Sequence, residues 1–307
     1  MSESLSCGAF VGVERRTGTG TAPGTFGELL QGVLPDGRHF LVTLPITRGT
    51  SAEFRWEPDT TGLTVVPDDR HKAARLTARM FERFAAPGGG VLTLRSDLLP
   101  GKGMASSSAD LVASARAVGD ALGISLRSRD IEDLLRGIEP SDGVMHPGAV
   151  AFYHREVRLR ERLGELPPLT IVGIDEGDEI DTIAFNRITH QFPASERAAY
   201  AALLDTLGAA VRARDVSTIG QVATASALRN QRLCPKRMLE PLVGVCEDVG
   251  GAGIAAAHSG TVLGILLDER DPAYPDRLAA AVRACTELGT VSIDHTGRPA
   301  GARTGRA

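Results

Sequence analysis

The sequence predicts an α+β fold, and three observations lead to this prediction. Apolar runs typical of strands and segments with helical spacing occur in both halves of the chain, without the strict alternation of a doubly wound sheet. The chain has 307 residues, of which 42% are hydrophobic, enough for two medium-sized domains. A Pro-Pro pair at 167–168 precedes a new strand. We therefore expect domains at residues 19–163 and 164–295, with disordered tails at 1–18 and 296–307.

The first domain is expected to begin with strands. Residues 21–56 contain two apolar runs separated by a Pro-Asp-Gly turn, which is typical of a hairpin. Residues 90–99 are strand-like, and residues 139–153 form a polar loop that enters a strand. Helical spacing predicts helices at 68–85, 108–123 and 128–138.

The second domain is expected to mix the same elements. It opens with a strand at 165–175, and residues 239–272 indicate a helix, a glycine-rich turn and then a strand. A short strand is expected at 290–294. Further helices are predicted at 195–215, 216–233 and 273–289.

Composition excludes several classes of function. The formal net charge of −4 gives no basic surface for nucleic acid. The cysteines show no metal-ligand or disulfide spacing, as expected of reduced thiols. No apolar run reaches the roughly 20 residues of a membrane helix, and the first residues lack the charge order of a signal peptide. We expect a cytoplasmic protein with neither a nucleic acid nor a membrane as partner.

The stretch "LLPGKGMASSSAD" at 98–110 lies between a predicted strand and a predicted helix. Its glycines, Gly101 and Gly103, let the backbone approach a ligand closely, and a helix N-terminus can bind an anion. The serines at 106–108 can cap the helix, donate to phosphate oxygens or hold a magnesium ion. Lys102 precedes a glycine, so the loop is not a Walker A motif, and the chain has no Gly-x-Ser-x-Gly motif and no metal-spaced histidine pair.

Three other polar features are weaker by themselves. Asp142 lies in a turn bounded by proline and glycine, where aspartate usually bonds its own backbone. Residues 250–264 form a glycine-rich turn that suits either a phosphate or a tight helix-to-strand connection. Glu28 and Gln31 lie in an apolar hairpin, either on an exposed face or at a ligand site.

The order of these features resembles the GHMP small-molecule kinase superfamily. The sequences "APGTFGE", "PGKGMASSSAD", "PSDG" and "GAGIAAAHSG" follow one another as that superfamily's motifs do, over roughly residues 20–290. The resemblance implies an N-terminal domain like ribosomal protein S5 domain 2, a C-terminal ferredoxin-like domain and an active site between them. It also implies ATP, Mg²⁺ and phosphorylation of a substrate hydroxyl.

The resemblance also implies roles for individual residues. Asp142 would be the catalytic base, and Ser107 would be a magnesium ligand. The partner carboxylate for magnesium would be Glu132, with Glu139 as the alternative. Gly251 and Gly253 would help to close the site. The phosphate loop would comprise Pro100, Gly101, Lys102, Gly103, Met104, Ala105, Ser106, Ser107 and Ser108. The substrate would meet Glu28, Gln31, His258, Ser259 and Gly260.

Within the superfamily, "GTFGELLQG" and "AHSGTVLGIL" look most like the L-threonine kinase branch associated with cobamide side-chain synthesis. The expected partners are ATP and a small hydroxy amino acid, or another small alcohol, and a homodimer is compatible with the sequence. A regulator that binds nucleotide without catalysis is the competing class. Glu28 could bind the substrate ammonium, and Arg187, Arg229 or His258 its carboxylate. Thr25 stands where related kinases carry a lysine that tunes the base.

Overall fold

A computed structural model describes residues 16–177 and 191–297. Its ten strands form one sheet in the order β10-β7-β9-β8-β1-β2-β4-β3, with β5 and β6 branching from β2. The strands are β1 (Arg16–Val33), β2 (His39–Glu57), β3 (Gly62–Val66), β4 (Gly89–Ser96), β5 (Ala149–Tyr153), β6 (Arg158–Gly164), β7 (Leu169–Asp175), β8 (Gly253–Ala256), β9 (Val262–Asp268) and β10 (Val291–His295). All pairs are antiparallel except β3 with β4.

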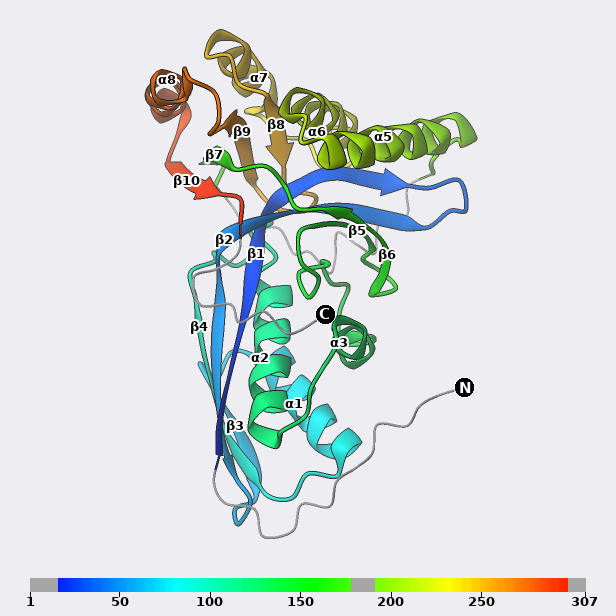
Figure 1. Cartoon of the computed structure of the whole chain (residues 1–307), viewed down its shortest axis with the longest axis vertical. Coiled ribbons are helices and arrows are strands. Elements are labelled where there is room, and N and C mark those ends of the chain that lie inside the picture. Colours follow the sequence, from blue (N-terminus) through cyan, green and yellow to red (C-terminus); the bar gives the residue numbers. More distant parts are fainter. Residues whose placement is uncertain (1–15, 178–190, 298–307) are drawn as a thin grey trace.

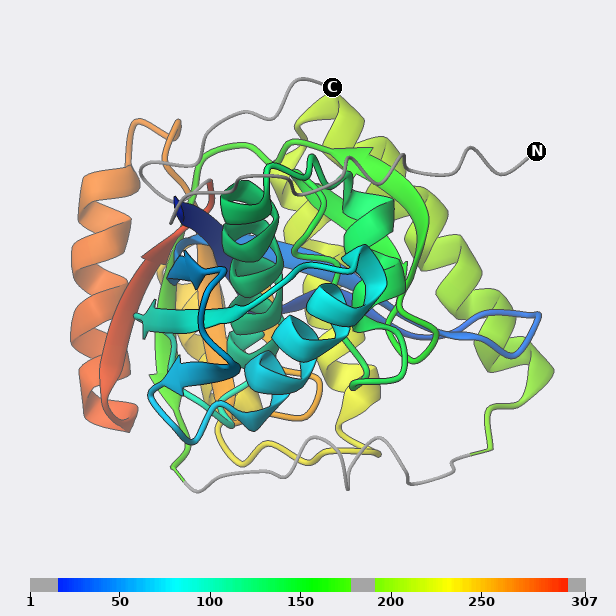
Figure 2. The ribbon, with the colours of Figure 1, turned by 90° about the horizontal axis from the view of Figure 1, so that it is seen from below.

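The helices fall into two groups. The first group packs beside the long strands in the lower part of the molecule, and the second covers the C-terminal strands in its upper part (Figure 1). In the view from below, α5 and α8 lie at opposite sides of the molecule (Figure 2). The helices are α1 (His71–Phe84), α2 (Ser106–Leu122), α3 (Ser128–Leu135), α5 (Ala194–Ala213), α6 (Val216–Asn230), α7 (Leu239–Asp248) and α8 (Tyr274–Leu288).

The helix α1 illustrates why these segments fold as they do. Its buried residues, among them Leu76 and Met80, recur at three- and four-residue intervals and face the core. Arginine and glutamate residues occupy its exposed face. The helix ends at Ala85, whose left-handed conformation closes the last turn.

The strand β1 joins the two groups of elements. Its pairing with β2 is irregular at three places between Pro23 and Leu30. Such irregularities bend a strand and increase its twist. At Glu28 the bent strand also pairs with Ala256 of β8, so the sheet continues into the C-terminal half.

The predicted α+β fold is confirmed, and each predicted helix lies within two or three residues of its expected bounds. Sequence analysis missed β3, β6 and the separate strand β8. The strand β1 begins at Arg16, and Thr296 donates its N–H to the Leu169 carbonyl, so both described ends extend slightly into the expected tails. The expected domain boundary falls at the end of β6. Among the described residues, no helix is both long and apolar enough to span a bilayer.

Candidate active site

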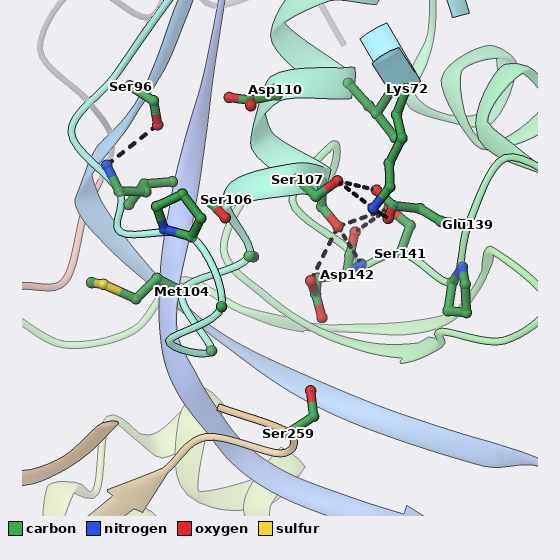
Figure 3. A pocket seen from close by; sticks show the side chains of 18 of the residues that line it. Lys72, Ser96, Met104, Ser106, Ser107, Asp110, Glu139, Ser141, Asp142 and Ser259 are labelled. Atoms are coloured by element: carbon green, nitrogen blue, oxygen red, sulfur yellow. Dashed lines mark hydrogen bonds and ion pairs between the residues drawn. The ribbon is translucent and has the colours of Figure 1, made fainter. Parts of the chain in front are cut away.

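A cavity of about 410 Å³ lies beside the start of α2. One wall comes from the beginning of α1 and the loop before α2, and another from the turn before β5. Ser259 faces it from the C-terminal half (Figure 3). Four segments that are distant in sequence therefore meet around one space.

The loop before α2 presents its backbone to this cavity. Ala105 occupies the N-cap position in the left-handed conformation, with φ 55°, and no side chain caps the helix. Capping, one of the roles open to the serines, is therefore not seen at the N-cap, and the first N–H groups of α2 lie beside the cavity without a capping side chain. The lining residues from this loop are Pro100, Gly101, Gly103, Met104, Ala105, Ser106, Ser107 and Ser108.

Lys102 is the one residue of the predicted phosphate loop that does not line the cavity. Its ammonium pairs with the Asp175 carboxylate at 3.0 Å, and its carbonyl accepts the N–H groups of Thr261 and Val262. The side chain thus joins the loop to the C-terminal half of the sheet. The Lys102 side chain is held by Asp175, and a contact between its backbone and the nucleotide stays a prediction.

Gly103 shows how tightly the loop is held. Its φ is +85°, and a Cβ at this position would lie 2.3 Å from the Cβ of Ala257. Its carbonyl accepts the N–H of Gly27, and the Met104 carbonyl accepts the N–H of Thr25. The bent part of β1 and the turn after β8 therefore fix the shape of the loop.

Ser107, Glu139 and Lys72 form a polar cluster at the cavity wall (Figure 3). The Ser107 hydroxyl donates to one Glu139 oxygen at 2.5 Å, and the Lys72 ammonium donates to the other. Lys72 Nζ also lies 3.2 Å from Ser107 Oγ. Sequence analysis missed Lys72, because one lysine at the start of an amphipathic helix has the pattern of an ordinary surface charge.

Glu132, the predicted magnesium ligand, lies elsewhere. Its buried carboxylate accepts a hydrogen bond from the Leu159 N–H at 3.0 Å and is 2.7 Å from Nε2 of His146. These contacts tie α3 to the segment after Asp142. They give the Glu132 carboxylate partners inside the protein, and Glu132 does not line the cavity. The prediction for Glu132 is therefore wrong, and the competing residue Glu139 is the carboxylate beside Ser107.

Asp142 lies next to this cluster and lines the cavity. The Ser108 hydroxyl donates to Asp142 Oδ2 at 3.1 Å and accepts the Asp142 N–H at the same distance. Burial raises the pKa of Asp142 to about 6; the Ser108 hydrogen bond opposes this shift, and the Glu139 charge adds to it. A carboxyl with this pKa is suited to accept a proton near neutral pH.

Glu28 of β1 also lines the cavity. Its Oε2 is buried without a hydrogen-bond partner, and burial, followed by the nearby charge of Asp142, raises its pKa well above the ordinary value. A cation placed beside Glu28 would remove that cost. Leu41, which pairs with Gln31 across β1 and β2, adds an apolar side chain to the lining.

His258 and Ser259 also line the cavity. Burial, together with neighbouring basic groups, lowers the pKa of His258 to about 3, so its imidazole is neutral at pH 7. A neutral imidazole could contact a substrate carboxylate as an N–H donor but would not neutralise its charge. Gln31 lies behind it, with its side-chain oxygen bonded to His258 Nδ1.

The remaining predicted substrate residues have structural contacts. Gly260 packs against the backbone of Lys102, and its carbonyl accepts the Lys236 ammonium. The Arg229 guanidinium lies 5.9 Å from the centre of the Tyr200 ring, and Arg187 lies outside the described residues.

The two glycines expected to close the site pack elsewhere. A Cβ on Gly251 would meet the Cys246 sulfur, and one on Gly253 would meet the backbone of Gly220 in α6. Both therefore allow close packing around β8, and we correct the prediction that they close the site.

The sequence matches two family models, GHMP kinases N terminal domain over residues 71–154 and GHMP kinases C terminal over residues 207–289. It is 27% identical to the L-threonine kinase of Citrobacter freundii over 251 residues, covering 80% of this chain and 85% of that protein. It is also 27% identical to the L-threonine kinase of Salmonella typhimurium over 256 residues, or 81% and 82% of the two proteins.

Solved structures share the fold at lower sequence identity. The homoserine kinase of Cytophaga hutchinsonii superposes with a TM-score of 0.68 at 16% identity and covers 97% of both chains. The L. major mevalonate kinase, solved with R-mevalonate, gives a TM-score of 0.66 at 16% identity and covers 98% of this chain and 100% of its own.

Proposed function

Because this chain belongs to the GHMP kinase superfamily and is a phosphotransferase with an alcohol as acceptor, we propose that it transfers the γ-phosphoryl group of ATP to the side-chain hydroxyl of L-threonine. The proposed mechanism rests on one observation. Asp142, with a pKa of about 6, lies beside the Ser107–Glu139 pair and the uncapped start of α2 in a single cavity.

The proposed nucleotide contacts are mainly electrostatic. The N–H groups at the start of α2 would donate to phosphate oxygens, as helix N-termini do for anions. Gly103, where a Cβ would collide with Ala257, would keep the loop in the shape that presents these N–H groups. Phosphoryl transfer depends chiefly on such positioning and on charge stabilisation.

The oxygens of Ser107 and Glu139 fit a magnesium site. A hydroxyl and a carboxylate lie together at the cavity wall, and oxygen donors of this kind suit Mg²⁺. Bound there, the ion would supply charge neutralisation for the phosphates.

Asp142 would act as the general base. Its carboxylate would take the proton of the threonine hydroxyl while that oxygen forms a bond to the γ-phosphorus. The bond from the γ-phosphorus to the bridging oxygen breaks, and that oxygen leaves with ADP. The Ser108 hydroxyl, which accepts from the Asp142 N–H and donates to its Oδ2, would hold the carboxylate in one orientation for this transfer.

The lining around Glu28 suits a small amino acid as the acceptor. The unpartnered oxygen of Glu28 would accept the substrate ammonium, and Leu41 is an apolar neighbour for the threonine methyl group. The likeness to L-threonine kinases supports the same acceptor. We extend the proposal to cobamide side-chain synthesis on the sequence motifs alone.

Mg²⁺-dependent release of ADP tests the proposal. The full chain is assayed with L-threonine, L-serine, L-homoserine and small alcohols that are not amino acids. The expected result is the highest kcat/KM for L-threonine, with O-phospho-L-threonine as product. A preference for a non-amino-acid alcohol would remove threonine but keep the kinase, and ATP binding without turnover of any acceptor would favour the regulator.

A further inference from the structure

Lysine is rare in this chain, and its positions are not scattered. Of the 34 basic residues, 31 are arginines, and the lysines are Lys72, Lys102 and Lys236. Lys72 lines the cavity, Lys102 lies in the phosphate loop, and Lys236 donates to the carbonyl of Gly260, which adjoins Ser259. Arginine thus serves almost everywhere for surface charge, while the compact ammonium of lysine occurs around one site.

Only one of these ammonium groups faces the cavity. Lys102 Nζ pairs with Asp175, and the buried Lys236 Nζ contacts the Gly260 carbonyl and the Cys234 sulfur. Lys72, the second residue of α1, instead reaches Ser107 and Glu139 (Figure 3). Its side chain is 40% exposed, so the ammonium has space in which to exchange partners.

The other strongly basic side chain in the lining already has partners. Arg70 lies 3.2 Å from Asp110 Oδ2 and 3.1 Å from Asp69 Oδ2. Lys72, by contrast, has as its two partners the oxygens that we propose as magnesium ligands. If those oxygens hold a cation, the ammonium of Lys72 needs a new anion within reach.

We propose that Lys72 is a catalytic residue that binds the terminal phosphate of ATP, an inference that rests on the proposed function. A triphosphate at the start of α2 brings several negative charges to the place where Glu139 now neutralises Lys72. An ammonium has three donors, so it can hold a phosphate oxygen and stay close to Glu139. Its charge would stabilise the phosphoryl group during transfer.

The position of the base points to the terminal phosphate. Ser107 contacts Lys72, and its neighbour Ser108 holds Asp142. The phosphorus under attack must lie beside the hydroxyl that Asp142 deprotonates. Because Ser107 and Ser108 are consecutive, Lys72 lies at this end of the triphosphate.

The test measures nucleotide binding to the full chain by calorimetry with Mg²⁺ in excess and without an acceptor. Replacing Lys72 by Met should weaken ATP binding on the order of tenfold to a hundredfold, the range for a hydrogen bond to a charged group. Because ADP lacks the terminal phosphate, the affinity for ADP should change by less than about twofold in the same variant. Lys72→Arg, which keeps the charge, should recover most of the ATP affinity.

Arg75→Met is the matched control. Arg75 lies one turn further along α1, is exposed and bonds the Gly137 carbonyl, so this variant removes the same charge from the same helix. Its affinities for ATP and ADP should equal those of the wild type. Circular dichroism and thermal unfolding establish that each variant is folded.

The outcomes separate this inference from the proposed function. Unchanged ATP affinity in Lys72→Met, or equal losses for ATP and ADP, would overturn the role of Lys72. A selective loss for ATP would support it even if the wild type phosphorylated an alcohol other than threonine. A wild type that bound no ATP would overturn the proposed function and this inference together.

Discussion

In the proposed mechanism Asp142 is the single proton acceptor. Replacing it by Asn keeps the size of the side chain and an oxygen that can accept from Ser108, but removes the base. We expect kcat to fall by about 10²–10⁴-fold, the usual contribution of a general base. ATP affinity, measured by calorimetry, should be unchanged. An Asp142→Asn variant with wild-type turnover would show that Asp142 is not the base.

The pKa of Asp142 also predicts the pH dependence. Burial raises this pKa to about 6, so the carboxylate form predominates above pH 6 and the protonated form below it. The value of kcat/KM should therefore be constant at high pH and fall about tenfold per pH unit below 6. Initial rates between pH 4.5 and 8 test this. An inflection that persists in the residual activity of Asp142→Asn would assign it to another group.

The two competing glutamates provide a matched pair of variants. Glu139→Gln removes the carboxylate beside Ser107, and we expect Mg²⁺-dependent turnover to fall by at least about tenfold. Glu132→Gln alters the buried contact with His146, and we expect a loss of about 1–3 kcal/mol in the free energy of unfolding. Mg²⁺ titrations of activity and urea unfolding distinguish them. A changed Mg²⁺ requirement in Glu132→Gln would contradict the assignment.

These residues show how much of the site the sequence predicts. Asp142, Ser107 and Ser108 are recognisable because they lie in short segments whose order resembles known motifs. Glu132 lies in α3 and Glu139 in the loop after it, and which of them reaches Ser107 depends on how α3 packs against residues 146 and 159. Lys72 enters the site through the placement of α1, which no local pattern encodes.

At the scale of the element, the loop before α2 depends on Gly103. Gly103→Ala would place a Cβ 2.3 Å from the Cβ of Ala257, whereas Gly37→Ala meets nothing within 4 Å; both glycines have φ near +85°. Each variant should lose roughly 1 kcal/mol of stability from backbone strain. Only Gly103→Ala should also weaken ATP binding, measured by calorimetry. Equal ATP affinities in the two variants would contradict a role for the loop in binding phosphate.

The helices and the longer strands follow from sequence periodicity, but the continuity of the sheet does not. The single backbone pair between Glu28 and Ala256 joins residues that are far apart in the chain. The bend in β1 that permits it comes from irregular pairing with β2, where Gly27 has a φ of 53°, but the local sequence does not specify the distant strand that pairs there. Propensity and pattern thus predict the elements, and tertiary packing determines how two groups of strands become one sheet.

At the scale of the whole molecule, the site depends on how the two halves are held together. The buried carboxylate of Asp294 in β10 accepts two hydrogen bonds from Arg48 in β2, at 2.6 and 2.8 Å. The same guanidinium lies 3.8 Å from the sulfur of Met104 in the phosphate loop. Arg48 therefore links the C-terminal strand, a central strand and the cavity wall.

Replacing Arg48 by Met should destabilise the protein, because it leaves the Asp294 carboxylate buried without a cation. Asp294 is 0% exposed but Arg48 is 31% exposed, so we expect a loss of about 2–4 kcal/mol. For a chain of this size that lowers Tm by at least about 4 °C. Arg55→Met, which removes a more exposed arginine from β2, should lower Tm by less than about 2 °C. Thermal unfolding measures both.

The double variant Arg48→Met with Asp294→Asn distinguishes the buried charge from lost packing. Asn removes the uncompensated carboxylate, so the double variant should recover a large part of the stability lost in Arg48→Met. Because Arg48 also contacts Met104, ATP affinity should fall in both variants, even where stability returns. A double variant no more stable than Arg48→Met would show that the arginine acts through packing alone. Unchanged ATP affinity would show that the phosphate loop keeps its shape without this link.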